Sequence, residues 1–117
     1  MFESIKHAQR DGIEVLTLSG QFIGGEETDK LRDTLTSVAQ QEHNRLIIDL
    51  TDVSYLNSTA LGVLISSHAN FSKRGGRIAL CNISKSIENI FVITKLTLVF
   101  EIHPTVDEAI KHFQTNS

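Results

Sequence analysis

Near the amino end, apolar and polar residues alternate in two short runs, which is the pattern of strands. The runs are Phe2–Ala8 and Ile13–Ser19, and an Asp11-Gly12 pair lies between them. Asp-Gly between two such runs is typical of a two-residue β-hairpin, because both turn residues must adopt positive φ. The sequence therefore predicts a sheet that opens with an antiparallel pair of strands.

Farther along the chain, apolar residues recur every three to four positions, which predicts amphipathic helices. The first helix is expected over Glu26–Gln41, after a turn at Gly24-Gly25, and the second over about Ser58–Arg74, ending at Gly75-Gly76. The expected buried positions are Leu31, Leu35, Val38 and Ala39 in the first helix and Leu61, Leu64, Ile65, His68 and Ala69 in the second.

Two shorter helices are expected closer to the carboxyl end. The first contains Ile87, Ile90 and Phe91. The second opens with a capping box, in which Thr105 is the N-cap and Glu108 is the third helical residue. Its expected buried positions are Val106, Ala109, Ile110 and Phe113.

Apolar runs between the helices predict three more strands, at Leu46–Leu50, Arg77–Cys81 and Leu98–Ile102. Nearly unbroken apolar runs are typical of strands covered on both faces, and alternation of such strands with helices implies right-handed crossovers onto a parallel sheet. A polar loop is expected over residues 51–57. We therefore predict one α/β domain over residues 1–117, with a mixed sheet of four to five strands opened by the hairpin and about four helices mainly on one face.

Charge and composition exclude several functional classes. The net charge of −3 argues against nucleic-acid binding, since only Lys73, Arg74 and Arg77 cluster. No apolar run approaches the ~18 residues of a membrane span, and residues 1–10 contain no apolar signal segment. The lone Cys81 cannot form an internal disulfide, which favours a reducing compartment. We expect a cytoplasmic protein that binds neither nucleic acid nor membrane.

Motifs for a metal site or for hydrolysis are missing from the sequence. The five histidines show no His-x-x-x-His spacing, so we expect no metal and no cofactor, and His68 is interpreted as a half-buried helix residue. The chain has no phosphate loop of the Gly-x-x-x-x-Gly-Lys type, and the residues around Ser58 lack the glycines of a nucleophile elbow.

The most informative segment is 47–64, where a buried strand leads through a polar stretch to the start of a helix. It contains Asp49-Leu50-Thr51, then Tyr55-Leu56, then Asn57-Ser58-Thr59-Ala60-Leu61-Gly62. This pattern resembles the STAS domain of the anti-sigma factor antagonist type, in which an Asp-Leu-Ser or Asp-Leu-Thr strand end is followed by Asp-Ser-Ser-Gly-Leu-Gly. The resemblance continues through Leu18-Ser19-Gly20, Gly75-Gly76 and the helix opened by Thr105. Asn57 stands where the family usually has Asp, and Ala60 where it usually has Gly.

The resemblance implies a STAS fold and a phosphorylation switch without enzymatic activity. Ser58 matches the phospho-acceptor of the family, with Thr59 as a minor candidate. The implied partners are an anti-sigma factor serine kinase, whose capture frees a sigma factor, and a serine phosphatase; the protein itself is expected to be a monomer or weak dimer. Asp49 and Asp52 are expected to support the pocket. The expected partner-binding residues are Asn57, Ser58, Thr59, Ala60, Gly62, Val63, Ser66, Ser67 and Asn70.

The position of Ser58 fits this role on physical grounds, since a helix start has unpaired N–H groups and a partial positive charge that tolerate a phosphate. Three other interpretations remain open. Ser58 can be a plain capping hydroxyl. The chain can be a STAS scaffold subunit of a signalling or transport complex that is never phosphorylated. Lastly, Ser58 can be the nucleophile of a small hydrolase or phosphotransferase.

Overall fold

The computed structural model describes residues 4–41 and 45–115. Their sheet has five strands in the order β1-β2-β3-β4-β5, and only the β1–β2 pair is antiparallel. The bounds of the strands are β1 Ile5–Arg10, β2 Ile13–Phe22, β3 Arg45–Leu56, β4 Arg77–Cys81 and β5 Glu101–His103. The helices are α1 Glu26–Ala39, α2 Ser58–Lys73, α3 Lys85–Ile93 and α4 Val106–Thr115, with a short 3₁₀ turn at Leu96–Leu98. This is the predicted mixed sheet, opened by the predicted hairpin.

The backbone geometry at one hairpin turn and two helix ends agrees with the sequence predictions. Asp11 and Gly12 both have positive φ, as the two-residue hairpin requires. Gly75 has φ of +76°, and the Gly76 N–H donates to the Phe71 carbonyl at 2.7 Å, which ends α2 in a Schellman motif. The Thr105 hydroxyl accepts a hydrogen bond from the Glu108 N–H at 3.1 Å, so the predicted N-cap of α4 is confirmed.

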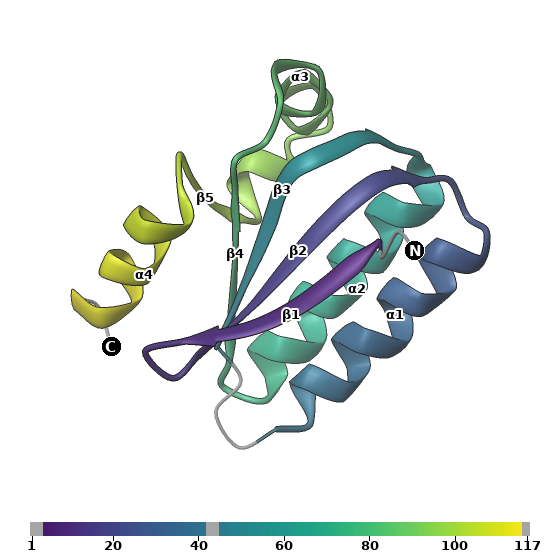
Figure 1. The fold of residues 1–117 in the computed structure, drawn as a ribbon. Helices are drawn as coiled ribbons and strands as arrows, with labels where there is room; N and C mark the ends of the chain where they lie inside the picture. Colours follow the sequence, from purple (N-terminus) through teal and green to yellow (C-terminus); the bar gives the residue numbers. More distant parts are fainter. Residues whose placement is uncertain (1–3, 42–44, 116–117) are drawn as a thin grey trace.

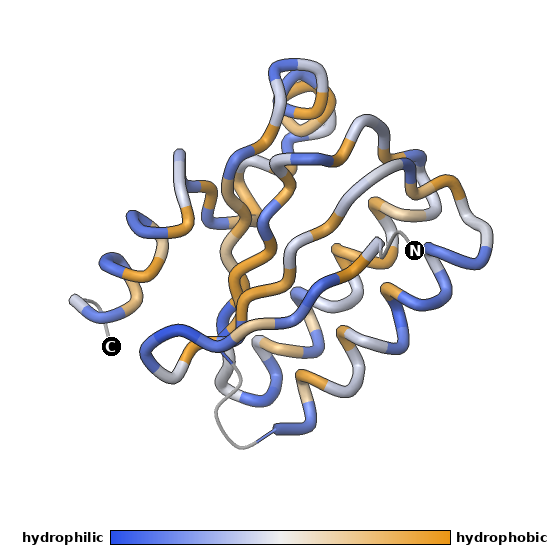
Figure 2. Tube along the Cα trace, in the orientation of Figure 1, coloured by the Kyte–Doolittle hydropathy of each residue, from blue (hydrophilic) through white to orange (hydrophobic). Residues whose placement is uncertain are grey.

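The sheet separates two apolar cores. Helices α1, α2 and α3 contribute to the larger core on one face, and α4 covers the other face (Figure 1). Neighbouring residues of β3 enter different cores: Leu46 and Ile48 face α1 and α2, whereas Ile47 faces α4. This explains the unbroken apolar run, and Figure 2 shows apolar residues concentrated along β3 and β4. The helices lie mainly on one face, as predicted.

The predicted end of β3 is wrong. Residues 51–56 continue the strand, although a loop was expected there. Against β2, the register shifts twice, between Thr17 and Ser19 and between Gly20 and Gln21, and each time β3 contains one residue more than its partner. Such bulges interrupt the alternation of a strand, so the burial pattern no longer has the period of two that identifies a strand in a sequence.

The predicted last strand is also displaced. Leu96 and Phe100 are buried, but Leu98 and Val99 between them are exposed. The Phe100 N–H donates to the Leu96 carbonyl at 3.0 Å, so this apolar run is a helical turn, and β5 begins only at Glu101. The first two residues predicted for β1, Phe2 and Glu3, lie outside the described residues. No helix in the described part of the chain is long and apolar enough to cross a membrane.

Candidate functional site

Asn57 fixes the start of α2 through two hydrogen bonds, one within the helix and one to the end of β2. Asn57 is the N-cap of α2, and its side-chain oxygen accepts from the Ala60 N–H at 3.0 Å. The Asn57 N–H donates to the Phe22 carbonyl at 3.1 Å. Since Leu56 already pairs with Phe22 in the sheet, the strand and the helix start are held by the same partner strand. The position of the next residue, Ser58, is therefore well defined.

Ser58 is the first helical residue of α2, and its side chain is exposed. Among residues 4–41 and 45–115, its hydroxyl has no hydrogen-bond partner, so the hydroxyl is not the cap of this helix. Capping is done by Asn57, which excludes the plain capping interpretation of Ser58. An exposed hydroxyl at a helix start lies next to main-chain N–H groups that the helix cannot pair and to the positive end of its dipole.

Thr59 has a different environment from Ser58. A Cβ on Gly24 would lie 3.5 Å from the Thr59 Cβ and 3.6 Å from the Thr59 hydroxyl oxygen. Thr59 therefore faces the loop between β2 and α1. Gly24 has φ of +87°, a conformation that residues with a Cβ rarely adopt, and its N–H donates to the buried Thr28 hydroxyl at 2.9 Å. This loop is shaped to pack against the start of α2.

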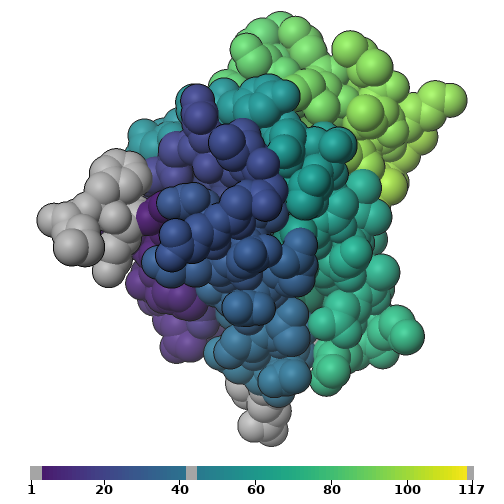
Figure 3. All heavy atoms as spheres, turned by 90° about the vertical axis from the view of Figure 1, so that its right-hand side faces the viewer, coloured from purple at the N-terminus to yellow at the C-terminus, as the bar shows by residue number. Residues whose placement is uncertain are grey.

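A surface groove of about 470 Å³ lies between α1 and α2. The two helices lie side by side on this face in Figure 3, with α1 in blue and α2 in teal. The part of the lining that comes from α2 consists of six predicted partner-binding residues: Thr59, Gly62, Val63, Ser66, Ser67 and Asn70. The α1 wall, formed by Arg32 and Thr36, was not predicted. The i, i+4 spacing of these two polar residues was the available signal, because it puts both on one side of α1.

Predictions about α2 side chains are wrong in both directions, since some residues are more buried and others more exposed than expected. As an expected partner-binding residue, Val63 should lie on the exposed face of α2, but it is only 5% exposed. Ala60, which should lie in the exposed turn around Ser58, is fully buried. The buried positions of α2 are Ala60, Val63, Leu64 and Phe71, whereas Ile65, at 41%, and Ala69 are exposed although the sequence pattern predicts both to be buried. Apolar residues occupy nearly every position from 60 to 65, so the sequence did not determine which side faces the sheet. Val63 still lines the groove, as part of its floor rather than of its rim.

Asp49 and Asp52 are not among the residues that line the groove. The Asp49 carboxylate accepts from the Thr51 N–H and from the Asn82 side chain, both at 3.0 Å, and so ties β3 to the end of β4. Burial, and to a smaller degree the charge of Asp49, raise the pKa of the Cys81 thiol to about 12. This thiol is neutral at physiological pH and is part of the core. Asp52 is exposed.

Replacement of Asn57 by Ala tests the cap directly. Asn57→Ala is expected to lower the free energy of unfolding by about 1 kcal/mol, because the Ala60 N–H loses its acceptor. Asn57→Asp retains the acceptor oxygen and is expected to keep nearly the wild-type stability. Urea denaturation followed by circular dichroism measures both. Equal losses in the two variants would contradict the role of the side-chain oxygen.

Comparisons with known proteins agree with this geometry. Residues 4–109 match the sequence profile of the STAS domain. The anti-sigma-B factor antagonist of Listeria monocytogenes is 31% identical over 102 residues, which cover 84% of each chain. The crystal structure of an anti-sigma factor antagonist from Mycobacterium paratuberculosis has a TM-score of 0.80 at 24% identity, covering 92% of this chain and 91% of the other. The Bacillus cell fate determinant SpoIIAA in its phosphorylated form has a TM-score of 0.72 at 19% identity, covering 93% and 98%.

The profile match extends from the start of the sheet to α4, and so includes the bulged strand, the Asn57 cap and the groove. The agreement in fold extends over more than nine tenths of both compared structures. The expected fold class and the expected resemblance are confirmed. This chain belongs to the STAS domain family.

Proposed function

We propose that this protein is an anti-sigma factor antagonist, a binding switch without enzymatic activity. The unphosphorylated protein captures an anti-sigma factor that is also a serine kinase, and a sigma factor is thereby released. The kinase phosphorylates Ser58 to end the capture, and a serine phosphatase restores the hydroxyl. The observation that carries the proposal is the exposed, unpaired Ser58 hydroxyl at the start of α2, next to the groove between α1 and α2.

The environment of Ser58 makes phosphorylation tolerable for this protein. The modified side chain remains in solvent at the positive end of α2, where negative charge is stabilising by about 0.3–1 kcal/mol. The helix start is held by Asn57 and by its bond to Phe22, neither of which involves the Ser58 side chain. The Asn that replaces the usual Asp keeps this cap. The fold is thus expected to remain the same in both forms, and the switch acts through the surface.

For the partner, the same phosphate is costly. Phosphoserine adds about 1.5 to 2 negative charges near pH 7. A partner carboxylate ~4 Å away at an effective dielectric near 20 repels each of them by roughly 4 kcal/mol. The groove beside Ser58 gives the partner a docking surface through Thr59, Gly62, Val63, Ser66, Ser67 and Asn70, as well as Arg32 from α1.

The relatives support this class of function. The Listeria protein bears the name anti-sigma-B factor antagonist, and SpoIIAA is known in a phosphorylated form. An enzymatic role for Ser58 has less support, because no histidine or carboxylate of the described residues forms a hydrogen bond with its hydroxyl. We infer that the switch operates in the cytoplasm, as a monomer or weak dimer.

Phosphate mapping tests the proposal. The protein is incubated with its cognate anti-sigma factor kinase and ATP, and the modified peptides are identified by mass spectrometry. One phosphate is expected, on Ser58, because its hydroxyl is exposed at the helix start and has no hydrogen-bond partner among the described residues, whereas Thr59, although also exposed, faces the loop that contains Gly24.

Two variants serve as matched controls. Ser58→Ala is expected to abolish the modification, and Thr59→Ala, which removes the neighbouring hydroxyl, is expected to leave it unchanged. Phosphate on Thr59, or stable binding of the kinase without any phosphate on Ser58, would refute the proposed switch.

A further inference from the structure

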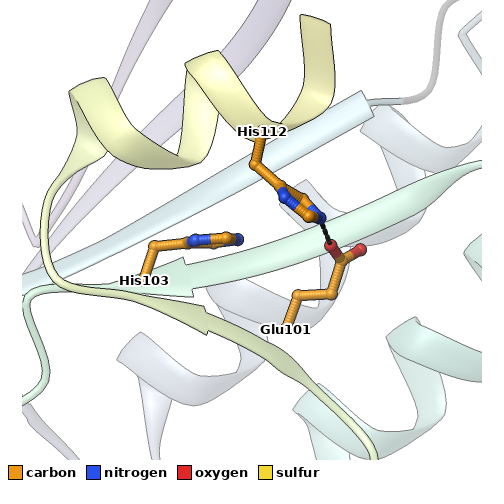
Figure 4. Close-up of side chains that lie close together, drawn as sticks. All are labelled: Glu101, His103 and His112. Carbon is orange, nitrogen blue, oxygen red and sulfur yellow. Dashed lines mark ion pairs between the residues drawn. The ribbon is translucent and has the colours of Figure 1, made fainter. Parts of the chain in front are cut away.

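Three side chains with metal-binding atoms meet far from the groove, on the opposite side of the sheet. Glu101 and His103 extend from β5, and His112 comes from the last turn of α4 (Figure 4). One donor atom from each of the three lies within 4.8 Å of the other two, and all three residues are half-buried. We call these residues the β5–α4 cluster. It is independent of Ser58 and of the proposed switch.

The fold itself brings these residues together. Residues two apart in a strand point to the same face, so Glu101 and His103 both face α4. Helix α4 is held on that face by the buried side chains of Ala109, Ile110 and Phe113. His112 is adjacent to Phe113 on the helix. The centroid of the His112 ring lies 4.8 Å from the centroid of the His103 ring. The cluster is therefore pre-formed by the packing of the smaller core.

One donor atom has no partner among the described residues. The Nε2 atom of His103 is buried and accepts no hydrogen bond and donates none. Leaving a buried polar atom unpaired is energetically unfavourable, so such an atom requires an explanation. Burial and, to a smaller degree, the neighbouring His112 lower the pKa of His103.

The other two donors already contact each other. The His112 Nε2 atom lies 3.1 Å from a carboxylate oxygen of Glu101. Arg77 donates to both oxygens of this carboxylate, at 2.7 and 3.1 Å, and its guanidinium lies 4.6 Å from the centre of the Phe113 ring. Arg77 orients the carboxylate, but its positive charge also opposes a cation. We therefore expect weaker binding than in closed sites with four protein ligands.

We propose that the β5–α4 cluster is a binding site for a divalent transition metal, of which Zn²⁺ is the best match, and that the bound ion joins α4 to β5. Two imidazoles with one carboxylate suit Zn²⁺, whereas Mg²⁺ and Ca²⁺ prefer oxygen ligands alone. Ligand atoms about 2.0–2.2 Å from a tetrahedral Zn²⁺ lie about 3.3–3.6 Å apart. The donor atoms of the cluster lie within 4.8 Å of one another, so small side-chain rotations are enough to bring them to these distances. The hollow beside it, lined in part by His103 and His112, gives the ion access from solvent.

Calorimetric titration with ZnCl₂ after treatment with a chelator tests this site. The wild-type protein is expected to bind one equivalent of Zn²⁺, and its thermal midpoint is expected to rise with the metal concentration. His103→Gln and His112→Gln are each expected to weaken binding by about 100-fold or more, because each removes one of three ligands. His7→Gln is the matched control, since His7 also lies beside a carboxylate, 3.7 Å from Glu14, at the opposite edge of the sheet. This variant is expected to bind like the wild type.

A spectroscopic measurement on the wild type avoids dependence on the folding of the variants. Co²⁺ in place of Zn²⁺ is expected to broaden the nuclear magnetic resonances of α4 and β5, while those of β1 and of the α1–α2 groove are unaffected. The absence of Zn²⁺ binding by the wild type would overturn the proposal. So would equal binding by wild type and the doubly substituted His103→Gln, His112→Gln protein, or broadening centred on another part of the chain.

Discussion

Ser58→Asp is expected to weaken binding of the proposed partner, an anti-sigma factor kinase, by about a thousandfold. The substitution puts a permanent negative charge at the exposed first residue of α2, beside the groove between α1 and α2. Repulsion from one partner carboxylate at ~4 Å amounts to roughly 4 kcal/mol at an effective dielectric near 20, and every 1.4 kcal/mol is a factor of ten in affinity. Calorimetric titration of the kinase with each variant measures the effect, which is expected to shrink at high salt.

Charge must be distinguished from damage to the surface. Ser58→Ala removes the hydroxyl without adding charge and is expected to bind within a few fold of the wild type. Ser72→Asp adds the same charge at an exposed serine fourteen residues along α2, roughly 21 Å away at 1.5 Å per residue, and is expected to bind normally. Unchanged affinity of Ser58→Asp would favour the scaffold interpretation, in which Ser58 is never modified.

The fold was largely predictable because its local signals agree with one another. The Asp11-Gly12 turn, the Thr105 cap and the glycines after α2 each have the geometry that their sequence indicates. The apolar run of 46–50 identified a strand covered on both faces, and the two cores confirm it. Each of these features is determined by residues that are close together in the chain, so it can be predicted from the sequence alone.

The errors occur where tertiary contacts determine the outcome. The second half of β3 was mistaken for a loop because its bulges are defined by the register against β2, which the sequence of β3 does not contain. The inward side of α2 was misplaced at Val63 and Ile65, since apolar residues at nearly every position leave its rotation to the packing against α1 and the sheet. The groove was nevertheless partly predicted, because the expected partner-binding residues include six of the eight residues that line it.

The β5–α4 cluster had no sequence signal. His103 and His112 belong to a strand and to the helix that follows it, and their spacing is not that of a known metal motif. Their proximity follows from α4 folding back over the sheet face opposite to α1 and α2 (Figure 1). The cluster therefore depends on the docking of α4, and so does the smaller core. This dependence can be tested through a single aromatic side chain.

Phe113→Ala is expected to lower the free energy of unfolding by about 3–5 kcal/mol. Phe113 is fully buried, is the largest side chain that α4 contributes to the smaller core, and supports the Arg77 guanidinium at 4.6 Å from its ring centre. Domains of this size are typically stable by only about 5–15 kcal/mol, so the loss is a large share of the total. Urea denaturation followed by circular dichroism measures it. Leu98→Ala, at a side chain that is 83% exposed, is the control and is expected to change stability by less than about 0.5 kcal/mol.

The Phe113→Ala variant also tests whether α4 contributes to binding at the groove or only to the β5–α4 cluster and to stability. Because the smaller core faces away from α1 and α2, folded Phe113→Ala protein is expected to bind the proposed kinase partner with nearly wild-type affinity at low temperature. Loss of Zn²⁺ binding in the same variant, with kinase binding retained, would show that α4 serves the β5–α4 cluster and the stability of the sheet but not the groove. A stability loss below about 1 kcal/mol would contradict the docking of α4, because such a small loss is incompatible with a buried aromatic ring.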